Sequence, residues 1–430
     1  MHPLLHSPSR RTLLRAAGAG AGAAALAAAA GCGSSTAASG RTRIRFLMNK
    51  PEVVDHFTDL VARYNAEQDD VLVVLDTAPT SVLAQFVRGA PPDIACYNFR
   101  IEAANLVRAG VLADLSDLPE AAGIDPAYQD LVTQFASYQG QTSALPYSIG
   151  TAGMIYNVDL FEQHGVAVPT TWSELLAACE TFTAAGVAPF MNTYREVWTL
   201  AQGMFDYTTG SGVDVAAFHE GLQALGADAG PDAEVSFTRT LGPAVERMVQ
   251  LSQLDNPDAP SLTYYDGNLR FGRGEAAMYF QGPWALGEIV KVDPDIRLGS
   301  FPLPVTDDPA QARARVNLDL ALWIPRETER QEAARAFASW LLRPDVVDTY
   351  NADNSAQSPR TGAPPLADER LAGLQPCLDE KRIYQGISTY VPDSIPVGNY
   401  VQDAVLSGDP ERLLSRLDTD WQRRARRAAA

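Results

Sequence analysis

The sequence predicts an α/β fold in which short strands alternate with amphipathic helices. Three apolar runs, at 44–48, 71–75 and 93–97, have the length and residue types of buried strands. Apolar residues between the first two runs recur at helical spacing, at Val53, Phe57, Leu60, Val61 and Tyr64. Alternation of this kind predicts a mainly parallel sheet with helices on both faces.

Cap residues mark the ends of the first helices. Thr80 is a suitable N-cap for a short helix whose apolar residues are Leu83, Phe86 and Val87. Gly110 is a natural C′ residue for the helix that follows the third strand. These residues predict where one helix begins and where the next one ends.

A break at 145–150 separates this region from a second series of elements. A strand is expected at 154–157. Thr171 and Glu174 form a capping box that opens a helix ending near Gly186, and a strand is expected at 187–190. The periodicity then predicts a long helix at 239–254.

The stretch 274–286, GEAAMYFQGPWAL, predicts a buried strand that turns abruptly into a helix. The apolar run 276–280 suits a strand, Gly282 permits a sharp turn, and Pro283 suits the first helical position. Trp284 then lies at a helix start, where backbone N–H groups are unpaired and the helix dipole is positive. A flat ring beside such donors suits a ligand with an apolar face and a rim of hydroxyl groups. The alternative is that Trp284 packs in a core.

The last third of the chain continues the alternation. A strand is expected at 296–301, before the proline-rich segment 302–304, and another at 316–324, which Pro325 ends. Helices are expected at 331–342 and at 413–427. The arginines of the last helix indicate a solvated helix end.

Residues 1–31 have the features of an export signal. Arg10 and Arg11 lie in a twin-arginine pattern, and 16–31 is an apolar run too short to span a membrane. The residues before Cys32, Ala-Ala-Gly, resemble a bacterial lipobox, in which the cysteine is acylated. We expect a lipid anchor at Cys32 and a flexible tether at 32–40.

Charge and cysteine content exclude several classes of partner. The formal charge of −18 falls to −21 once three arginines leave with the export signal, which disfavours nucleic acids and anionic lipid surfaces. Cys96, Cys179 and Cys377 cannot all pair, and their spacing fits no zinc motif. Cys96 and Cys179 have the surroundings of small buried hydrophobic residues. We expect no metal, no cofactor and no nucleic-acid partner, with membrane contact only through the lipid anchor.

Several segments of the chain carry a family resemblance. They are LPYSIGTAGMIYNVDLFEQHGV followed by PTTWSELL, then GEAAMYFQGPW, FPLP and EAARAFASWLLRP. Together they resemble the extracellular solute-binding proteins (family 1) of sugar ABC transporters, over nearly the whole mature chain. The resemblance implies a two-lobed periplasmic-binding-protein-like fold of type II, with a ligand cleft between the lobes.

The family fold implies that the chain crosses between the lobes more than once. We expect crossings near 146–147, near 302–304 and shortly after Leu342, because proline-rich or irregular segments can absorb a hinge rotation. The first lobe would comprise 41–147 and 305–345. The second would comprise 148–304 and 346–430.

The resemblance also implies binding without chemistry. A solute, a mono- or oligosaccharide, would enter the cleft, and the closed form would dock on the membrane permease of an ABC importer. The protein would be a monomer, lipid-anchored on the extracytoplasmic face of the cell membrane, and not an enzyme.

Aromatic and polar residues near strand ends and crossings are the candidate ligand contacts. Aromatic rings can cover the C–H faces of a sugar, and amide or charged groups can bond its hydroxyls. The residues we select are Asn49, Tyr97, Asn98, Tyr147, Trp198, Trp284, Asp319 and Arg360.

Three of these candidates have an alternative role. Tyr147 could instead pack in the hinge, and Trp198 has the pattern of a helix residue that faces a core. Asp319 interrupts an apolar strand, where a carboxylate is costly unless it is paired. Its partner would be sugar hydroxyls or an arginine. Arg360 lies where the family often brings a loop over the cleft.

Two other functions compete with sugar binding. A lipid-anchored glycoside hydrolase would need two carboxylates across a cleft, but the chain has no HExxH, GxSxG or phosphate-loop motif. The second alternative is a protein of the same two-lobed fold that binds a solute other than a sugar. The aromatic-rich loops favour sugar.

Overall fold

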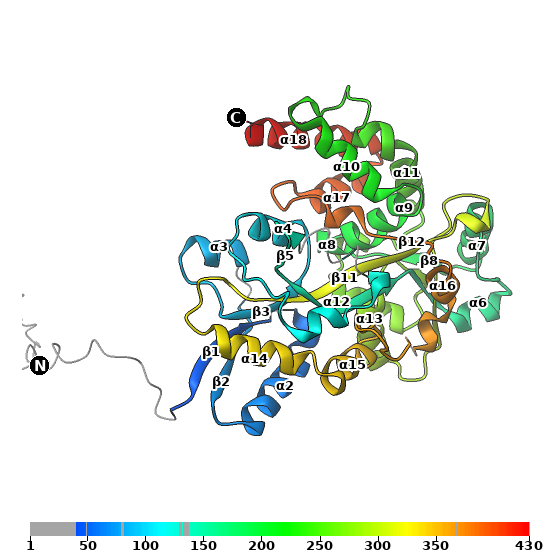
Figure 1. Cartoon of the computed structure of the whole chain (residues 1–430). Coiled ribbons are helices and arrows are strands. Elements are labelled where there is room, and N and C mark those ends of the chain that lie inside the picture. The colour runs from blue at the N-terminus through cyan, green and yellow to red at the C-terminus, as the bar shows by residue number, and fades with distance from the viewer. Residues whose placement is uncertain are drawn as a thin grey trace, which may run out of the picture.

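The computed structural model describes residues 40–48, 50–78, 81–128, 131, 137–365 and 368–429 (Figure 1). The expected export signal at 1–31, the acylation site Cys32, and Asn49 and Thr80 lie outside these ranges, as does all of the expected tether except its last residue. Within the described part of the chain, helices surround two main sheets.

The larger sheet has the order β12-β11-β3-β1-β2, and β6 also pairs with β11. Its strands are β1 (Thr42–Leu47), β2 (Val71–Asp76), β3 (Ile94–Asn98), β6 (Leu145–Ala152), β11 (Ala314–Trp323) and β12 (Ile383–Tyr384). Strand β1 runs parallel to β2 and β3, whereas β11 runs antiparallel to β3 and β6. The predicted parallel sheet is therefore correct for β1 to β3 and wrong for β6 and β11.

The smaller sheet has the order β10-β7-β9-β8. Its strands are β7 (Met154–Asn157), β8 (Ala188–Met191), β9 (Ala276–Tyr279) and β10 (Leu298–Phe301), and a separate hairpin joins β4 (Ser137–Tyr138) to β5 (Gln141–Thr142). Strand β9 is parallel to β8 and antiparallel to β7. Each predicted strand of this region is present close to its expected bounds.

Helices cover both sheets and form a separate layer near the C-terminus. The described α-helices are α2 (Val54–Glu67), α3 (Val82–Val87), α4 (Ile101–Arg108), α6 (Val158–His164), α7 (Trp172–Ala184), α8 (Val197–Leu200), α9 (Asp206–Gly210), α10 (Val215–Leu225), α11 (Phe237–Ser252), α12 (Tyr264–Gly272), α13 (Pro283–Val292), α14 (Gln331–Leu341), α15 (Pro344–Asp353), α16 (Gln375–Asp379), α17 (Val397–Ser407) and α18 (Pro410–Ala429). Helices α2 and α14 lie against β2 and β1, and α11, α17 and α18 pack on one another (Figure 1).

Local cap chemistry is confirmed for several helices. The Thr171 hydroxyl accepts from the N–H of Glu174 at 3.2 Å, and the Glu174 carboxylate accepts from the N–H of Thr171 at 3.2 Å, so the capping box of α7 is complete. Gly110 and Gly186 have φ angles of 67° and 77°, the left-handed conformation expected after a helix.

The prediction for α3 is corrected by the structure. Ser81 is its N-cap, accepting from the N–H of Ala84. Of its apolar residues, Leu83 is 56% exposed and Val87 is 81% exposed, and the helix buries Val82 and Gln85 instead.

The core of the larger sheet is rich in aromatic rings. Phe46 lies 5.1 Å from Phe337 and 5.8 Å from Phe57, measured between ring centroids. Tyr350 of α15 belongs to the same cluster, together with Val346 and Val347. The sequence predicted a third crossing between the lobes shortly after Leu342. Because α15 packs in the core of the larger sheet, we propose instead that the chain leaves this lobe after α15.

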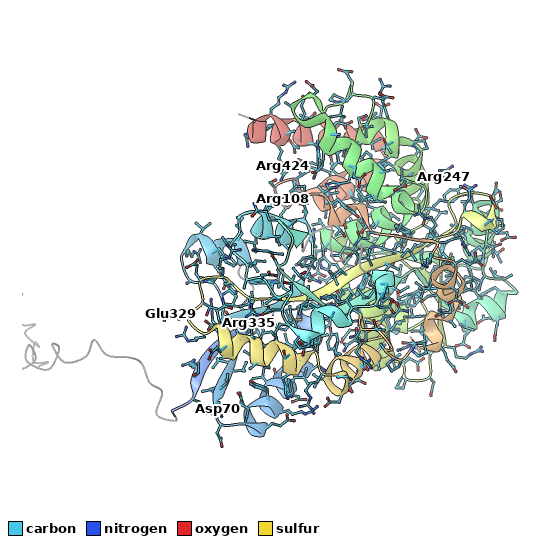
Figure 2. All side chains as sticks on the ribbon, viewed as in Figure 1. Asp70, Arg108, Arg247, Glu329, Arg335 and Arg424 are labelled. Atoms are coloured by element: carbon cyan, nitrogen blue, oxygen red, sulfur yellow. The ribbon has the colours of Figure 1, made fainter. Side chains whose placement is uncertain are left out.

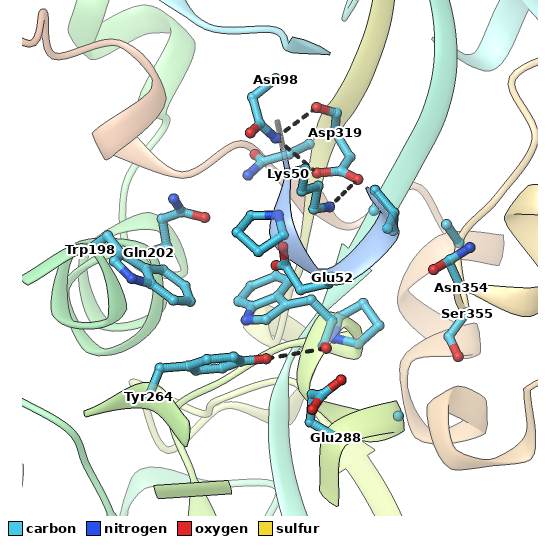
Figure 3. A pocket seen from close by; sticks show the side chains of 18 of the residues that line it. Lys50, Glu52, Asn98, Trp198, Gln202, Tyr264, Glu288, Asp319, Asn354 and Ser355 are labelled. Carbon is cyan, nitrogen blue, oxygen red and sulfur yellow. Dashed lines mark hydrogen bonds and ion pairs between the residues drawn. The ribbon is translucent and has the colours of Figure 1, made fainter. Parts of the chain in front are cut away.

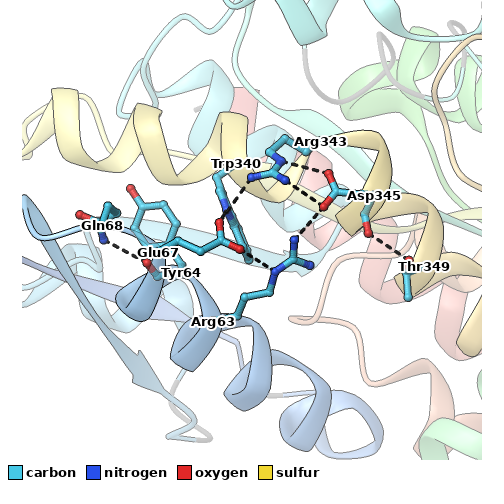
Figure 4. Close-up of polar contacts among 8 residues, drawn as sticks. All are labelled: Arg63, Tyr64, Glu67, Gln68, Trp340, Arg343, Asp345 and Thr349. Carbon is cyan, nitrogen blue, oxygen red and sulfur yellow. Dashed lines mark hydrogen bonds and ion pairs between the residues drawn. The ribbon is translucent and has the colours of Figure 1, made fainter.

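A surface network fastens α2 to α14 and α15 (Figure 4). The guanidinium groups of Arg63 and Arg343 lie 5.3 Å and 5.9 Å from the Trp340 ring centroid. Glu67 accepts from the Trp340 indole N–H at 2.7 Å, and Asp345 accepts from both arginines. Charged side chains elsewhere, such as Asp70 and Glu329, extend from the periphery (Figure 2).

Strands β6 and β11 connect the two parts of the fold. Leu145 and Leu322 lie in the core of the larger sheet, whereas Ala314, at the start of β11, lies in a cluster with Met191 and Tyr279 of the smaller sheet. The segment 145–150, expected as a break, is thus the first part of a long strand. We propose that the chain crosses along β6 and β11 and not at 302–304.

Candidate functional site

A cavity of about 710 Å³ lies between the two sheets (Figure 3). One side is formed by the segment after β1, the end of β3 and the middle of β11. The other side is formed by α8, α12 and the first turns of α13, and the residues after α15 close one end. Figure 3 shows Trp198 and Gln202 at one side of this cavity and Asn354 and Ser355 at the other.

Trp284 lines the cavity from the first turn of α13. The predicted strand and helix start are confirmed, with Pro283 at the first helical position, whereas Gly282 has extended backbone and no sharp turn. The indole N–H donates to the Gln281 Oε1 at 2.8 Å, and the Trp284 carbonyl accepts from the Tyr264 hydroxyl at 3.2 Å. A Cβ at Gly282 would lie 2.3 Å from the indole, so glycine is needed there for close approach of the ring. The ring is therefore held at a fixed angle.

Further aromatic rings extend this wall. Trp198 lines the cavity and lies 5.1 Å from Tyr264 between ring centroids, and Tyr264 lies 5.2 Å from Tyr265. We did not assign a role to Tyr264 or Tyr265 from the sequence. A capping box, in which the Thr263 and Asp266 side chains each bond the other's backbone N–H, begins α12 and could have indicated that both rings lie at a helix start.

The opposite wall is polar. The ammonium of Lys50 lies 2.7 Å from the Asp319 Oδ2, and the Asn98 amide donates to the Asp319 Oδ1 at 3.2 Å (Figure 3). Asp319 is thus paired with a lysine, not with the arginine that we considered. Burial lowers the pKa of Lys50, but Asp319 and Glu52 outweigh it and the net pKa is raised. Lys50 is charged in the cavity, and Tyr97 lines the same wall.

A buried ion pair supports the cavity floor. Arg315 lines the cavity, and its guanidinium donates to the Asp206 Oδ2 at 2.9 Å and 3.2 Å. Ser388 adds its backbone N–H at 2.8 Å and its hydroxyl at 2.7 Å to the same carboxylate. Because Arg315 and Asp206 are 3% and 0% exposed, this network fixes β11 against α9.

The basic groups that line the described part of the cavity are all paired with acids. Besides Lys50 and Arg315, Lys291 pairs with Glu288 at 2.6 Å and Arg370 pairs with Asp368 at 2.7 Å. Glu52 and Glu196 also line the cavity. The site therefore offers hydrogen-bond acceptors and aromatic faces, and does not favour an anionic solute.

Two predicted contacts lie away from the cavity. Tyr147 is fully buried, with its ring 5.7 Å from Phe57 and 5.0 Å from Tyr350, so it packs in the core of the larger sheet. Arg360 donates through Nε to both oxygens of Asp348, at 2.9 Å and 3.0 Å. We remove both from the proposed ligand contacts. Of the other candidates, those within the described residues all line the cavity: Tyr97, Asn98, Trp198, Trp284 and Asp319.

No group of three or more His, Cys, Asp and Glu side chains among the described residues could hold a metal ion. No helix in that part of the chain has the length and apolar content to cross a membrane. Cys96, Cys179 and Cys377 are buried free thiols.

Comparison with known sequences gives a family match over most of the chain. A family model described as bacterial extracellular solute-binding protein matches residues 50–348. An uncharacterised ABC transporter extracellular-binding protein of Pyrococcus horikoshii is 24% identical over 64% of this chain. The multiple sugar-binding protein of Streptococcus mutans is 24% identical over 48% of it. The matches span 60% and 49% of the length of these two relatives.

Comparison with solved structures shows the same fold. The solute-binding protein RafE in complex with raffinose has a TM-score of 0.77 at 20% identity, covering 89% of this chain and 99% of that one. The apo-form of RafE from Streptococcus pneumoniae has a TM-score of 0.72 at 20% identity, covering 89% and 97%. Both are likenesses of fold.

Proposed function

The chain belongs to the bacterial extracellular solute-binding protein family, and on this premise we propose that it binds a saccharide in the Trp284 cavity for an ABC importer. The protein binds its solute unchanged and passes it to a membrane permease. The observation that carries this proposal is the pairing of an aromatic wall with a polar wall across one cavity.

The two walls match the two kinds of surface on a sugar ring. Trp284, Trp198 and Tyr264 offer faces for the C–H groups of a pyranose. Asp319 and Asn98 lie opposite and bond hydroxyl groups, which donate and accept at once. The Streptococcus mutans relative is named for sugar binding, and RafE was solved with raffinose, which supports the same solute class.

Closure of the cavity would couple binding to transport. The polar wall is formed around the larger sheet, and the aromatic wall is formed by helices that share a core with strands of the smaller sheet; β6 and β11 join the two parts. A solute that contacts both walls binds the closed form more tightly than the open form, and this difference shifts the population toward closure. The closed form then docks on the permease.

A saccharide panel tests the proposed function. Purified protein is heated with galactose, melibiose, raffinose, stachyose, chitotriose and xylotriose in turn. A cognate sugar at 100 times its dissociation constant stabilises the fold by about 2.7 kcal/mol. The sugar is then recovered and analysed. An unchanged melting temperature with every sugar contradicts the proposal, and a cleaved sugar indicates a hydrolase instead.

The anchoring and location of the protein are part of the proposal. We propose that Cys32, which lies outside the described residues, is acylated and becomes the N-terminus of the mature chain, and that the monomeric protein remains on the extracytoplasmic face of the cell membrane. Replacement of Cys32 by serine would release the protein from the membrane fraction of a producing cell. Retention of the Cys32→Ser variant in that fraction contradicts lipid anchoring.

A further inference from the structure

A smaller cavity of about 330 Å³ adjoins the Trp284 cavity beyond Arg370. Ala356 and Arg370 line both cavities, so they form the junction between them. We call the smaller cavity the side pocket and define it by Asp348, Asn351, Ser358, Pro364, Asp368 and Arg370. It meets the Trp284 cavity at the end of that cavity where Asn354 and Ser355 lie, next to Ala356.

Two buried oxygen atoms in the side pocket lack a partner in the described part of the chain. Asn351 is 1% exposed; its amide donates to the carbonyls of Tyr147 at 2.9 Å and Val347 at 2.8 Å, and its Oδ1 accepts from no described donor. Ser358 is 8% exposed, and its hydroxyl has no described partner either. Because buried polar atoms in proteins are normally hydrogen-bonded, both oxygens call for a donor from outside the described part of the chain.

The charged groups of the side pocket are already neutralised. Arg360 donates to both oxygens of Asp348, and Arg370 donates to both oxygens of Asp368, at 2.8 Å and 2.7 Å. These pairs remove the attraction for a metal ion or for an anion. Both oxygens of Asp368 and the Oδ2 of Asp348 already accept two hydrogen bonds each, whereas the Oδ1 of Asp348 accepts one from described residues and keeps a lone pair that can accept from a hydroxyl. Pro364 adds an apolar surface, so the pocket suits a neutral polyol.

We propose that the solute is an oligosaccharide, with one unit against Trp284 and a terminal unit in the side pocket. The proposal rests on the proposed function and specifies the class of saccharide. The pocket volume is far above the ~30 Å³ that one water molecule takes up in the liquid. Asn351 and Ser358 then accept hydroxyl groups of the terminal unit, and Ala356 limits what can pass the junction.

The first test is affinity against chain length, measured by calorimetry. Three series are used: galactose, melibiose and raffinose; N-acetylglucosamine to chitotriose; xylose to xylotriose. In a series that binds, the trisaccharide is expected to bind at least about tenfold more tightly than the monosaccharide. Equal affinities in every series that binds overturn this inference and leave the proposed function in place. Binding of no saccharide overturns both.

Two variants test whether the additional affinity for the trisaccharide comes from the side pocket. Ala356→Phe narrows the junction, and it should lower trisaccharide affinity by about tenfold while the monosaccharide stays within about twofold. Ser358→Ala removes one acceptor and should weaken only the longer sugar. Its matched control is Ser300→Ala, since Ser300 is 3% exposed, also lacks a described hydroxyl partner, and lines a different cavity. Trisaccharide affinity unchanged in both Ala356→Phe and Ser358→Ala, at normal melting temperature, excludes the side pocket.

Discussion

The Nζ atom of Lys50 lies 2.7 Å from the Oδ2 atom of Asp319, and 269 residues of sequence separate the two. Lys50 follows the first strand, and Asp319 interrupts the apolar run of β11. Their side chains are 16% and 25% exposed, so each charge is largely withdrawn from water. The charge of Lys50 offsets the free-energy cost of placing the Asp319 carboxylate in an apolar strand. The other oxygen of that carboxylate, Oδ1, accepts from the Asn98 amide.

The Lys50–Asp319 pair should show strong energetic coupling. In a double-mutant cycle with Lys50→Met and Asp319→Asn, measured by urea unfolding, we expect a coupling free energy of about 0.5–3 kcal/mol. Because the pKa of Lys50 is raised in the folded state, its contribution is complete below the ordinary lysine pKa and is lost as pH rises through the folded value. The exposed Lys291–Glu288 pair is the control and should couple weakly. Equal coupling in both cycles would contradict the interpretation.

Trp284→Ala should remove most of the sugar affinity and leave the protein folded. The indole is partly exposed in the cavity, so its loss removes the stacking surface without opening a core. We expect affinity to fall by about 100-fold or more, comparable with loss of a binding hot spot. Trp172→Ala is the control, because Trp172 is also partly exposed and packs near Arg247 outside the cavity. Calorimetric affinity unaltered in Trp284→Ala would remove the leading site assignment.

Gln281 should act on binding through Trp284. It is fully buried, and its Oε1 accepts from the indole N–H at 2.8 Å. Gln281→Leu keeps the volume and removes the acceptor, so the ring loses its fixed angle. We expect about tenfold weaker sugar binding, with a shift of the tryptophan emission that Trp284→Ala in the same background abolishes. Weaker binding with unchanged emission would indicate a structural effect only.

Breaking the Arg315–Asp206 pair should be costly. Arg315→Met leaves a buried carboxylate with only the two Ser388 donors, and we expect a loss of about 3–5 kcal/mol in the free energy of unfolding. Replacing both residues, as Arg315→Met with Asp206→Leu, should recover most of that loss because no charge remains unpaired. Chemical denaturation of the two variants checks this. A double variant less stable than Arg315→Met alone would refute it.

His219 should make stability depend on pH in the acid range. Burial, followed by the charges of Arg108 and Arg424, lowers its pKa from 6.5 to about 4 (Figure 2). Between these values the unfolded chain binds a proton that the folded chain does not. Its contribution is therefore present above pH 6.5 and is lost as pH falls toward 4, by up to about 3 kcal/mol.

The variant His219→Gln isolates this effect. Unfolding free energies of the wild type and the variant are compared between pH 7 and pH 4. Their difference should change across the window in which His219 titrates, because the glutamine does not titrate. A constant difference over that range would show that His219 is not the group responsible.

The sequence alone determined the elements whose cause is local. The strand at β9 and the helix start at Pro283 arise within eight residues of chain. The capping box of α7 is set by two side chains three positions apart. Hydrophobic spacing likewise identified the buried face of α2. For these elements, hydrogen bonds and side-chain contacts between near neighbours suffice.

The tertiary structure decided which candidates face the cavity. Tyr147 and Trp284 are both large aromatic residues beside a proline, yet one packs between Phe57 and Tyr350 and the other lines the cavity. The partner of Asp319 could not be predicted from the sequence either, because the chain contains several basic residues, Lys50 and Arg315 among them, that could have paired with it. Which side chain faces the cavity, and which charged residues form an ion pair, depend on contacts between residues hundreds of positions apart. Periodicity within one element carries no information about what the other elements bring to it.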